Sequence, residues 1–191
     1  MTQEFKLQPG DILVNVNSGS DPWSRIRRWG LSSPYTHVFL YLGTFAIKGY
    51  TMEIPFLFES NGRGVVLRSL SERYGEQVVV MRLKPEFRDR LVAILNEAIN
   101  LASDLQAVYD YTCIPLHIIP RILHEKLGIP IALKYQRDEK MVCSEAVAEI
   151  YWEASAPVLP KNVVPLPGDF VELSSILSEV NRGKLSPEWV V

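Results

Sequence analysis

The chain has 191 residues, of which 47% are hydrophobic, and a formal net charge of -2. This length and apolar content suit one globular domain, so we expect residues 1–191 to form a single domain with its own core. The balanced charge, without a long basic run, argues against a nucleic-acid-binding protein. No secretory pattern and no apolar run near the roughly 20 residues that span a bilayer is found, so we expect a cytoplasmic protein without a transmembrane segment.

The N-terminal half carries the pattern of short strands. The turn sequence QPGD precedes ILVNV, residues 12–16, which predicts a strand rich in branched side chains. Asp21, Pro22 and Gly30 mark the N-cap, the first position and the end of a short helix. The unbroken apolar run inside THVFLYLG, residues 36–43, predicts a strand buried on both faces. Further strands are predicted around residues 46–50, 56–60, 64–69 and 78–83, with a turn at SNGRG, residues 60–64.

The second half is mostly helical in pattern. Pro85 opens the clearest helix, which runs to about Ala102 with apolar residues at helical spacing. From Tyr109 to Tyr135 the chain is apolar but broken by prolines, and we expect short helices and loops there, with an apolar insertion around residues 112–135. A lid over an acyl chain and ordinary core both fit this insertion, and core is favoured. An amphipathic helix follows from Val142 to Ala154, so the whole pattern predicts an α+β fold with a mostly antiparallel sheet.

Cysteine and histidine are scarce in this chain. Two cysteines do not make a disulfide framework, and without an export signal we expect both to be free thiols. The three histidines show neither paired CxxC nor HExxH spacing with Cys113 and Cys143. The sequence therefore predicts no metal ion and no other cofactor.

Cys143 lies in the first turn of the predicted helix, on the same apolar stripe as Ala146, Val147 and Ile150. The sulfur should therefore face the sheet, close to unpaired backbone N–H groups and to the positive end of the helix dipole, which favour a thiolate. A buried cysteine can also be merely a small hydrophobic residue, and the position alone leaves both interpretations open. Cys113 follows no helix-start signal, and we interpret it as a packed thiol.

A cysteine nucleophile needs a base, and the base needs a group that orients it. His37 lies at the start of the strand at residues 36–43, where a rigid element can hold an imidazole, whereas His117 and His124 lie in the proline-broken segment. A core histidine bonded to backbone is an equal alternative for His37. Glu59 follows an apolar run at a strand end and is the candidate orienting carboxylate, although its residue pattern by itself favours a solvated turn residue.

The ordered set PGDILV, THVFLYLG, an acidic residue before GVVLRSL, YDY and VCSEAV resembles the circularly permuted NlpC-like papain-fold proteins, and most closely their YiiX-like subgroup. Lecithin retinol acyltransferase-like enzymes are more distant relatives. The resemblance runs from Pro9 to about Leu173. It implies a permuted papain-like domain in which the histidine comes first and the cysteine last, with a mostly antiparallel sheet or barrel packed against helices.

The resemblance also assigns site residues. It places the nucleophile on Cys143, the base on His37 and the third polar residue on Glu59. Tyr109 and Asp110 match the YDY motif ahead of the cysteine helix. Tyr35 precedes His37 by two positions, and we expect these last three residues to line the substrate site.

The implied activity is that of a thiol hydrolase of the cysteine peptidase or amidase type. It would cleave an amide or ester bond in a peptide-like or acyl-lipid substrate through a thioester intermediate. Transfer of the acyl group to an acceptor other than water, as in a lipid acyltransferase, stays open. A non-catalytic module that binds a peptide or lipid on the same fold is the alternative, although it has no need of cysteine, histidine and glutamate together.

Overall fold

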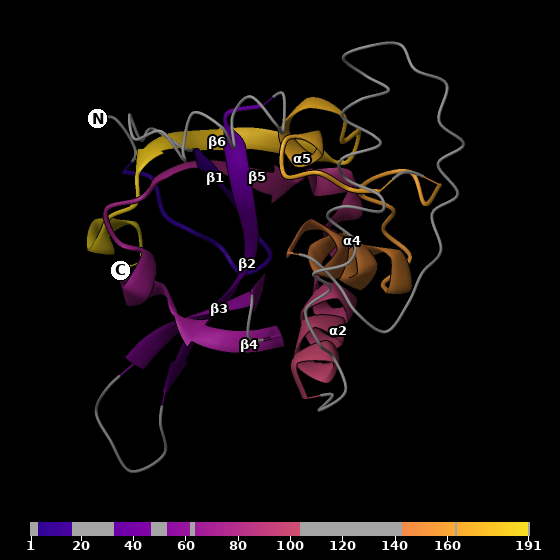
Figure 1. The fold of residues 1–191 in the computed structure, drawn as a ribbon. Helices are drawn as coiled ribbons and strands as arrows, with labels where there is room; N and C mark the ends of the chain where they lie inside the picture. Colours follow the sequence, from indigo (N-terminus) through magenta and orange to yellow (C-terminus); the bar gives the residue numbers. More distant parts are fainter. Residues whose placement is uncertain are drawn as a thin grey trace.

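The computed structural model describes residues 4–16, 33–46, 53–61, 64–103, 143–162 and 164–190. Within them, six strands form one open sheet in the order β4-β3-β2-β1-β5-β6 (Figure 1), and every neighbouring pair is antiparallel. The α+β class and the antiparallel sheet are therefore confirmed, and the sheet does not close into a barrel. The strands are β1 (Ile12–Val16), β2 (Tyr35–Ala46), β3 (Glu53–Asn61), β4 (Gly64–Ser69), β5 (Gln77–Leu83) and β6 (Leu177–Lys184).

The central strands are buried on both faces, as the apolar run in residues 36–43 predicts. Val14 and Leu40 belong to a large core beneath the helices, whereas Leu13 and Phe39 belong to a smaller core on the opposite face. Alternate side chains of a strand point to opposite faces, so an apolar run without alternation fills both cores. The smaller core is closed by the C-terminal 3₁₀ turn η4 (Pro187–Trp189).

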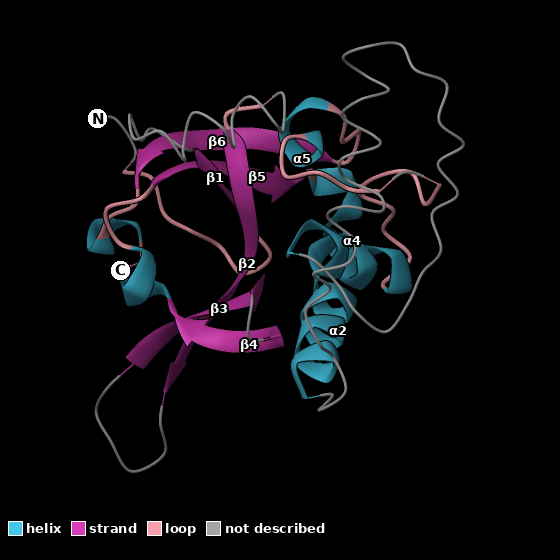
Figure 2. Cartoon of the chain, viewed as in Figure 1, coloured by secondary structure: helices cyan, strands magenta, loops and turns pink. Residues whose placement is uncertain are grey.

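The helices lie on one side of the sheet. Figure 1 shows α2 (Leu91–Ser103) beside α4 (Cys143–Glu153), and Figure 2 shows the two helices against the strands. The helix predicted from Pro85 begins instead as the 3₁₀ turn η2 (Pro85–Arg90), and the α-helical part starts at Leu91. No residue of η2 is buried, so the packing that stabilises an α-helix begins only where Ile94 enters the core.

The strand β6 is absent from our sequence prediction, which assigns no element to the segment after Ala154. The segment forms the short helix α5 (Asp169–Glu172) and then β6, which pairs with β5 at the edge of the sheet. The sequence of β6, LSEVNRGK, is mostly polar, and much of the strand is exposed. An edge strand needs little apolar surface, so hydrophobic periodicity does not reveal it.

Several predicted elements lie outside the described residues. These are the helix at residues 21–30, most of the strand at 46–50, the segment 109–135 with its apolar insertion, and Val142 at the start of the cysteine helix. The other strand predictions, at residues 12–16, 36–43, 56–60, 64–69 and 78–83, all fall inside observed strands.

The PGD turn anchors the cysteine helix to the sheet. Asp11 is fully buried and accepts two hydrogen bonds of 2.7 Å from the guanidinium of Arg82 on β5, and a third from the backbone N–H of Gln8. Gly10 has a φ of +87°, which favours glycine, and its carbonyl accepts a 3.0 Å hydrogen bond from the hydroxyl of the buried Tyr151 on α4. The motif therefore has a structural role in positioning α4.

Candidate active site

Cys143 is the first residue of α4 and is buried, with 8% of its surface exposed. Its sulfur accepts hydrogen bonds from the backbone N–H groups of Ser144 and Val38. The contact with Val38 on β2 means that the sulfur faces the sheet, as predicted. Burial by itself raises the pKa of the thiol, but the charge of His37, its hydrogen bond and the two backbone donors outweigh burial and lower the pKa.

A separation between two strands explains why the Val38 amide is free to reach the sulfur. The pairing of β2 with β3 ends at Leu40 and Phe58, so residues 35–39 of β2 pair only with β1 among the strands that the structure describes. Tyr41 directs both its N–H and its carbonyl toward the β1 side, where they bond with Asp11 and Gly10. Alternate residues of a strand bond to opposite sides, so the N–H of Val38 points to the side that β3 has left. The sulfur of Cys143 therefore lies on the side of β2 where the pairing with β3 has ended.

His37 lies on β2 opposite Asn15 of β1, and its side chain is 21% exposed. Its Nε2 is 3.5 Å from Oε2 of Glu59. Burial lowers the pKa of the imidazole, but the charge of Cys143, a hydrogen bond with Cys143 and the close contact with Glu59 outweigh that effect and raise the pKa to about 10. The two opposite shifts of His37 and Cys143 favour a thiolate–imidazolium pair at neutral pH.

Glu59 is fully buried near the end of β3, so the interpretation of this residue as a solvated turn residue is wrong. Burial raises the pKa of its carboxyl, but the close contact with His37, the charge of Arg73 and hydrogen bonds from Asn61 and Arg73 lower the pKa to about 2. The guanidinium of Arg68 adds an ion pair of 3.2 Å. A buried carboxylate stays ionised only where such partners compensate for lost water, and here they do.

The two arginine partners of Glu59 are absent from the sequence predictions. Arg68 lies on β4 in register with Leu57, two positions before Glu59 and on the same face of the sheet. Arg73 ends the 3₁₀ turn η1 (Leu70–Arg73). A buried carboxylate needs cationic partners, so a prediction that Glu59 is buried would have led to a search for nearby arginines. Both arginines lie in GVVLRSLSERYGE, shortly after Glu59 in the chain.

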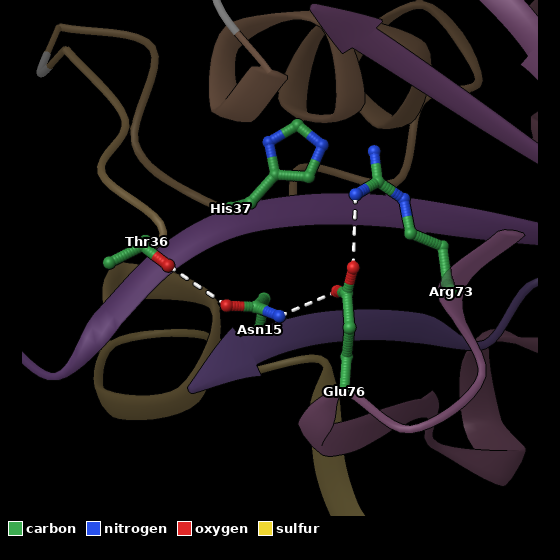
Figure 3. Close-up of a pocket in the computed structure, with 5 residues that line it drawn as sticks. All are labelled: Asn15, Thr36, His37, Arg73 and Glu76. Atoms are coloured by element: carbon green, nitrogen blue, oxygen red, sulfur yellow. Dashed lines mark hydrogen bonds and ion pairs between the residues drawn. The ribbon is translucent and has the colours of Figure 1, made fainter. Parts of the chain in front are cut away.

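A polar cavity of about 320 Å³ borders His37, and its other lining residues are Asn15, Thr36, Arg73 and Glu76 (Figure 3). The four side chains are linked to one another. Thr36 donates to Asn15 at 2.9 Å, Asn15 donates to Glu76 at 2.6 Å, and Arg73 donates to Glu76 at 3.1 Å. The cavity thus has a wall of fixed polar groups beside the imidazole.

The remaining predicted site residues are not gathered into this cluster by any contact that the structure describes. Tyr35 is 7% exposed, belongs to the helix-side core and forms a hydrogen bond with Arg182 of β6. Its role in lining the substrate site stays a prediction. Tyr109, Asp110, Cys113, His117 and His124 lie outside the described residues.

Among the described residues, no group of three or more histidine, cysteine, aspartate or glutamate side chains is arranged to hold a metal ion. None of the helices described is long and apolar enough to span a membrane.

The sequence matches no protein-family model and no curated protein. The structure, by contrast, is similar to the crystal structure of YiiX from Escherichia coli O157:H7, with a TM-score of 0.60 over 96% of this chain and 100% of that one. The fold is YiiX-like. The two sequences are only 16% identical, so the likeness concerns the fold alone. That structure is described as a metalloprotein.

Proposed function

We propose that this chain is a thiol hydrolase that cleaves an amide or ester bond through a Cys143–His37–Glu59 triad. The observation that carries the proposal is a buried thiol at a helix N-terminus that is hydrogen-bonded to the imidazole of His37. The imidazole in turn contacts the buried carboxylate of Glu59. The chain order of histidine, carboxylate and cysteine is the one that the resemblance to circularly permuted papain-like proteins implies.

The proposed reaction begins with the Cys143 thiolate. Its sulfur attacks the carbonyl carbon of the substrate, and the carbonyl electrons move onto oxygen. Backbone N–H groups at the N-terminus of α4 would stabilise that oxyanion, and the loss of one such donor typically costs about 3 kcal/mol in the barrier. The bond to the leaving group then breaks, the His37 imidazolium gives its proton to that group, and a thioester remains on Cys143.

The second half of the reaction releases the acyl group. Neutral His37 takes a proton from water as the water oxygen attacks the thioester carbonyl, and collapse of the adduct restores the thiolate and the imidazolium. Glu59 contacts Nε2 of His37 at 3.5 Å and stabilises the charged ring in both halves. Peptide-like amides and acyl-lipid esters are the two substrate classes proposed.

A metal-dependent activity is less well supported by the described residues. The YiiX structure is described as a metalloprotein, so the fit of a cation to this site is a necessary test. Cys143 and His37 offer two donors, but the Glu59 carboxylate is held by two guanidinium groups, which a cation would have to displace. This donor set does not fit a resident metal ion.

The test is the pH dependence of iodoacetamide labelling at Cys143, followed by peptide mass spectrometry in the wild type and in His37→Ala. We expect rapid labelling well below pH 8 in the wild type and loss of that advantage in His37→Ala, because the imidazolium stabilises the thiolate. Cys113 in the same molecule is the internal control. A Cys143 that titrates as an ordinary thiol in the wild type contradicts the proposal.

Turnover is then measured on a panel of small acyl amides, thioesters and phospholipids. Cys143→Ala should abolish turnover, whereas Cys113→Ala should leave it unchanged. Retained turnover in Cys143→Ala would exclude the thioester route, and substrate binding without turnover in the wild type would favour a binding module.

A further inference from the structure

One oxygen atom of Glu59 contacts two cations. Its Oε2 lies 2.6 Å from Nη2 of Arg73 and 3.5 Å from Nε2 of His37. The other oxygen, Oε1, accepts from Asn61 at 2.6 Å and lies 3.2 Å from Nε of Arg68. The two arginines therefore contact different oxygens of Glu59, and of the two only Arg73 contacts the oxygen that faces the imidazole.

Arg73 is itself held in place from two further sides. Its Nη1 donates to Oε1 of Glu76 at 3.1 Å, and its guanidinium carbon lies 5.7 Å from the centre of the Phe39 ring. Glu76 is fixed in turn by a 2.6 Å hydrogen bond from Asn15, and Asn15 accepts from Thr36. Figure 3 shows this chain of contacts, which begins at Arg73 and returns to β2 beside His37.

We propose that Arg73 is a positioning residue that holds the Glu59 carboxylate against His37, so that the imidazolium and the thiolate form together. The proposal rests on the function proposed above. It also gives the polar side chains along the cavity a role in the site. Asn15 holds Glu76, Glu76 holds the guanidinium of Arg73, and Arg73 in turn holds Glu59. Arg73 touches neither the thiol nor the imidazole in the contacts described, and acts through Glu59.

Two effects of Arg73 on the pKa of His37 have opposite signs, which makes the proposal testable. As a nearby cation, Arg73 disfavours the charged imidazole, so its removal should raise the pKa of His37. As a positioning residue, Arg73 keeps Glu59 ionised and directed at Nε2, so its removal should lower that pKa. The other charged groups to consider are Arg68 on β4, which stays in place, the Cys143 thiolate on α4, and Glu76, which lines the same cavity as His37 and pairs with Arg73.

The experiment is titration of the His37 ring by NMR, through the imidazole carbon–proton signals, with His37→Asn to assign the signal among three histidines. We expect Arg73→Met to lower the pKa of His37 by about one unit, and to slow iodoacetamide labelling of Cys143 at pH 6. Arg73→Lys keeps the charge but cannot bond Glu59 and Glu76 as a planar fork, and should lower the pKa of His37 by less. Arg68→Met, the matched control on Oε1, should not lower it.

A rise in the pKa of His37 in Arg73→Met, or an equal fall in Arg68→Met, would overturn the proposal. Should Arg73→Met not fold, Arg73→Lys decides by itself, because the charge is retained and only positioning is altered; an unchanged or higher pKa then overturns the proposal. Failure of the proposed function is separate and shows in the wild type, as an ordinary His37 pKa and an unreactive Cys143.

Discussion

The Nε2 atom of His37 on β2 lies 3.5 Å from Oε2 of Glu59 on β3, although both residues lie beyond the point where β2 and β3 stop pairing with each other. The separation of β2 from β3 makes room for the first turn of α4, and a backbone amide of β2 that no longer faces a strand bonds the thiol of Cys143. The sheet thus places both the imidazole and a backbone donor beside the thiol of Cys143.

The first prediction concerns the pH range of activity. The thiolate–imidazolium pair exists above the lowered pKa of Cys143 and below the pKa of His37, which is about 10. We therefore expect kcat/KM to be lost as the pH falls through the first value and as it rises through the second. The measurement is a pH–rate profile on an active substrate, and an alkaline limb near the ordinary histidine pKa would contradict the pair.

The second prediction is that Glu59→Gln lowers both the stability of the protein and the reactivity of the Cys143 thiol. Removing the buried charge leaves Arg73 and Arg68 without their shared carboxylate, and we expect the free energy of unfolding to fall by about 3 kcal/mol. The pKa of His37 should also fall, because an amide does not stabilise the imidazolium. Urea denaturation and iodoacetamide labelling measure the two effects.

Glu72→Gln is the control for that prediction. Glu72 pairs with the same Arg68 at 2.7 Å, but its side chain is 51% exposed. An exposed pair contributes little, so the change in the free energy of unfolding should stay under about 0.5 kcal/mol. Equal losses in the two variants would mean that burial of Glu59 does not carry the effect.

The third prediction is an acid-sensitive contribution of Glu59 to stability. Its folded pKa of about 2 lies below the ordinary value of 4.5, so its stabilising effect is fully present above pH 4.5. That effect is lost as the pH falls through about 2, where folded and unfolded states bind the same proton. Urea denaturation at a series of pH values should therefore show the wild type and Glu59→Gln converging in acid, and a constant difference would contradict this.

The fourth prediction separates the PGD turn from the chemistry. Asp11→Ala leaves the guanidinium of Arg82 and the N–H of Gln8 without their buried acceptor, and should lower the free energy of unfolding by about 3 kcal/mol. Cys143 should still label rapidly in the folded fraction, because Asp11 contacts none of the triad residues in the part of the chain described. Slow labelling in folded Asp11→Ala would give the turn a part in the site.

Glu179→Ala is the control for Asp11. Glu179 also forms a paired hydrogen bond with an arginine, Arg182, but both side chains are largely exposed. Solvent screens such a pair, so we expect a loss of less than about 1 kcal/mol.

Local sequence patterns determined much of this protein. The apolar run at residues 36–43 predicts a strand buried on both faces, and the stripe that includes Cys143 predicts a helix whose first turn faces the sheet. The strand prediction holds because the strand period decides which side chains share a face. The helix forms where it was predicted, but α4 is not amphipathic, because every residue from Cys143 to Trp152 is buried. The chain order of His37, Glu59 and Cys143 needed no structure either.

Only the tertiary structure decided the environment of those residues. Glu59 has the local pattern of a turn residue, yet it is buried, because the arginines at positions 68 and 73 reach its two oxygens from β4 and η1. The edge strand β6 likewise depends on which strands pair. The contact between the Val38 amide and the thiol depends on where the pairing of β2 with β3 ends. Such long-range partners determine the cost of burying a charge, and hydrophobic periodicity carries no information about them.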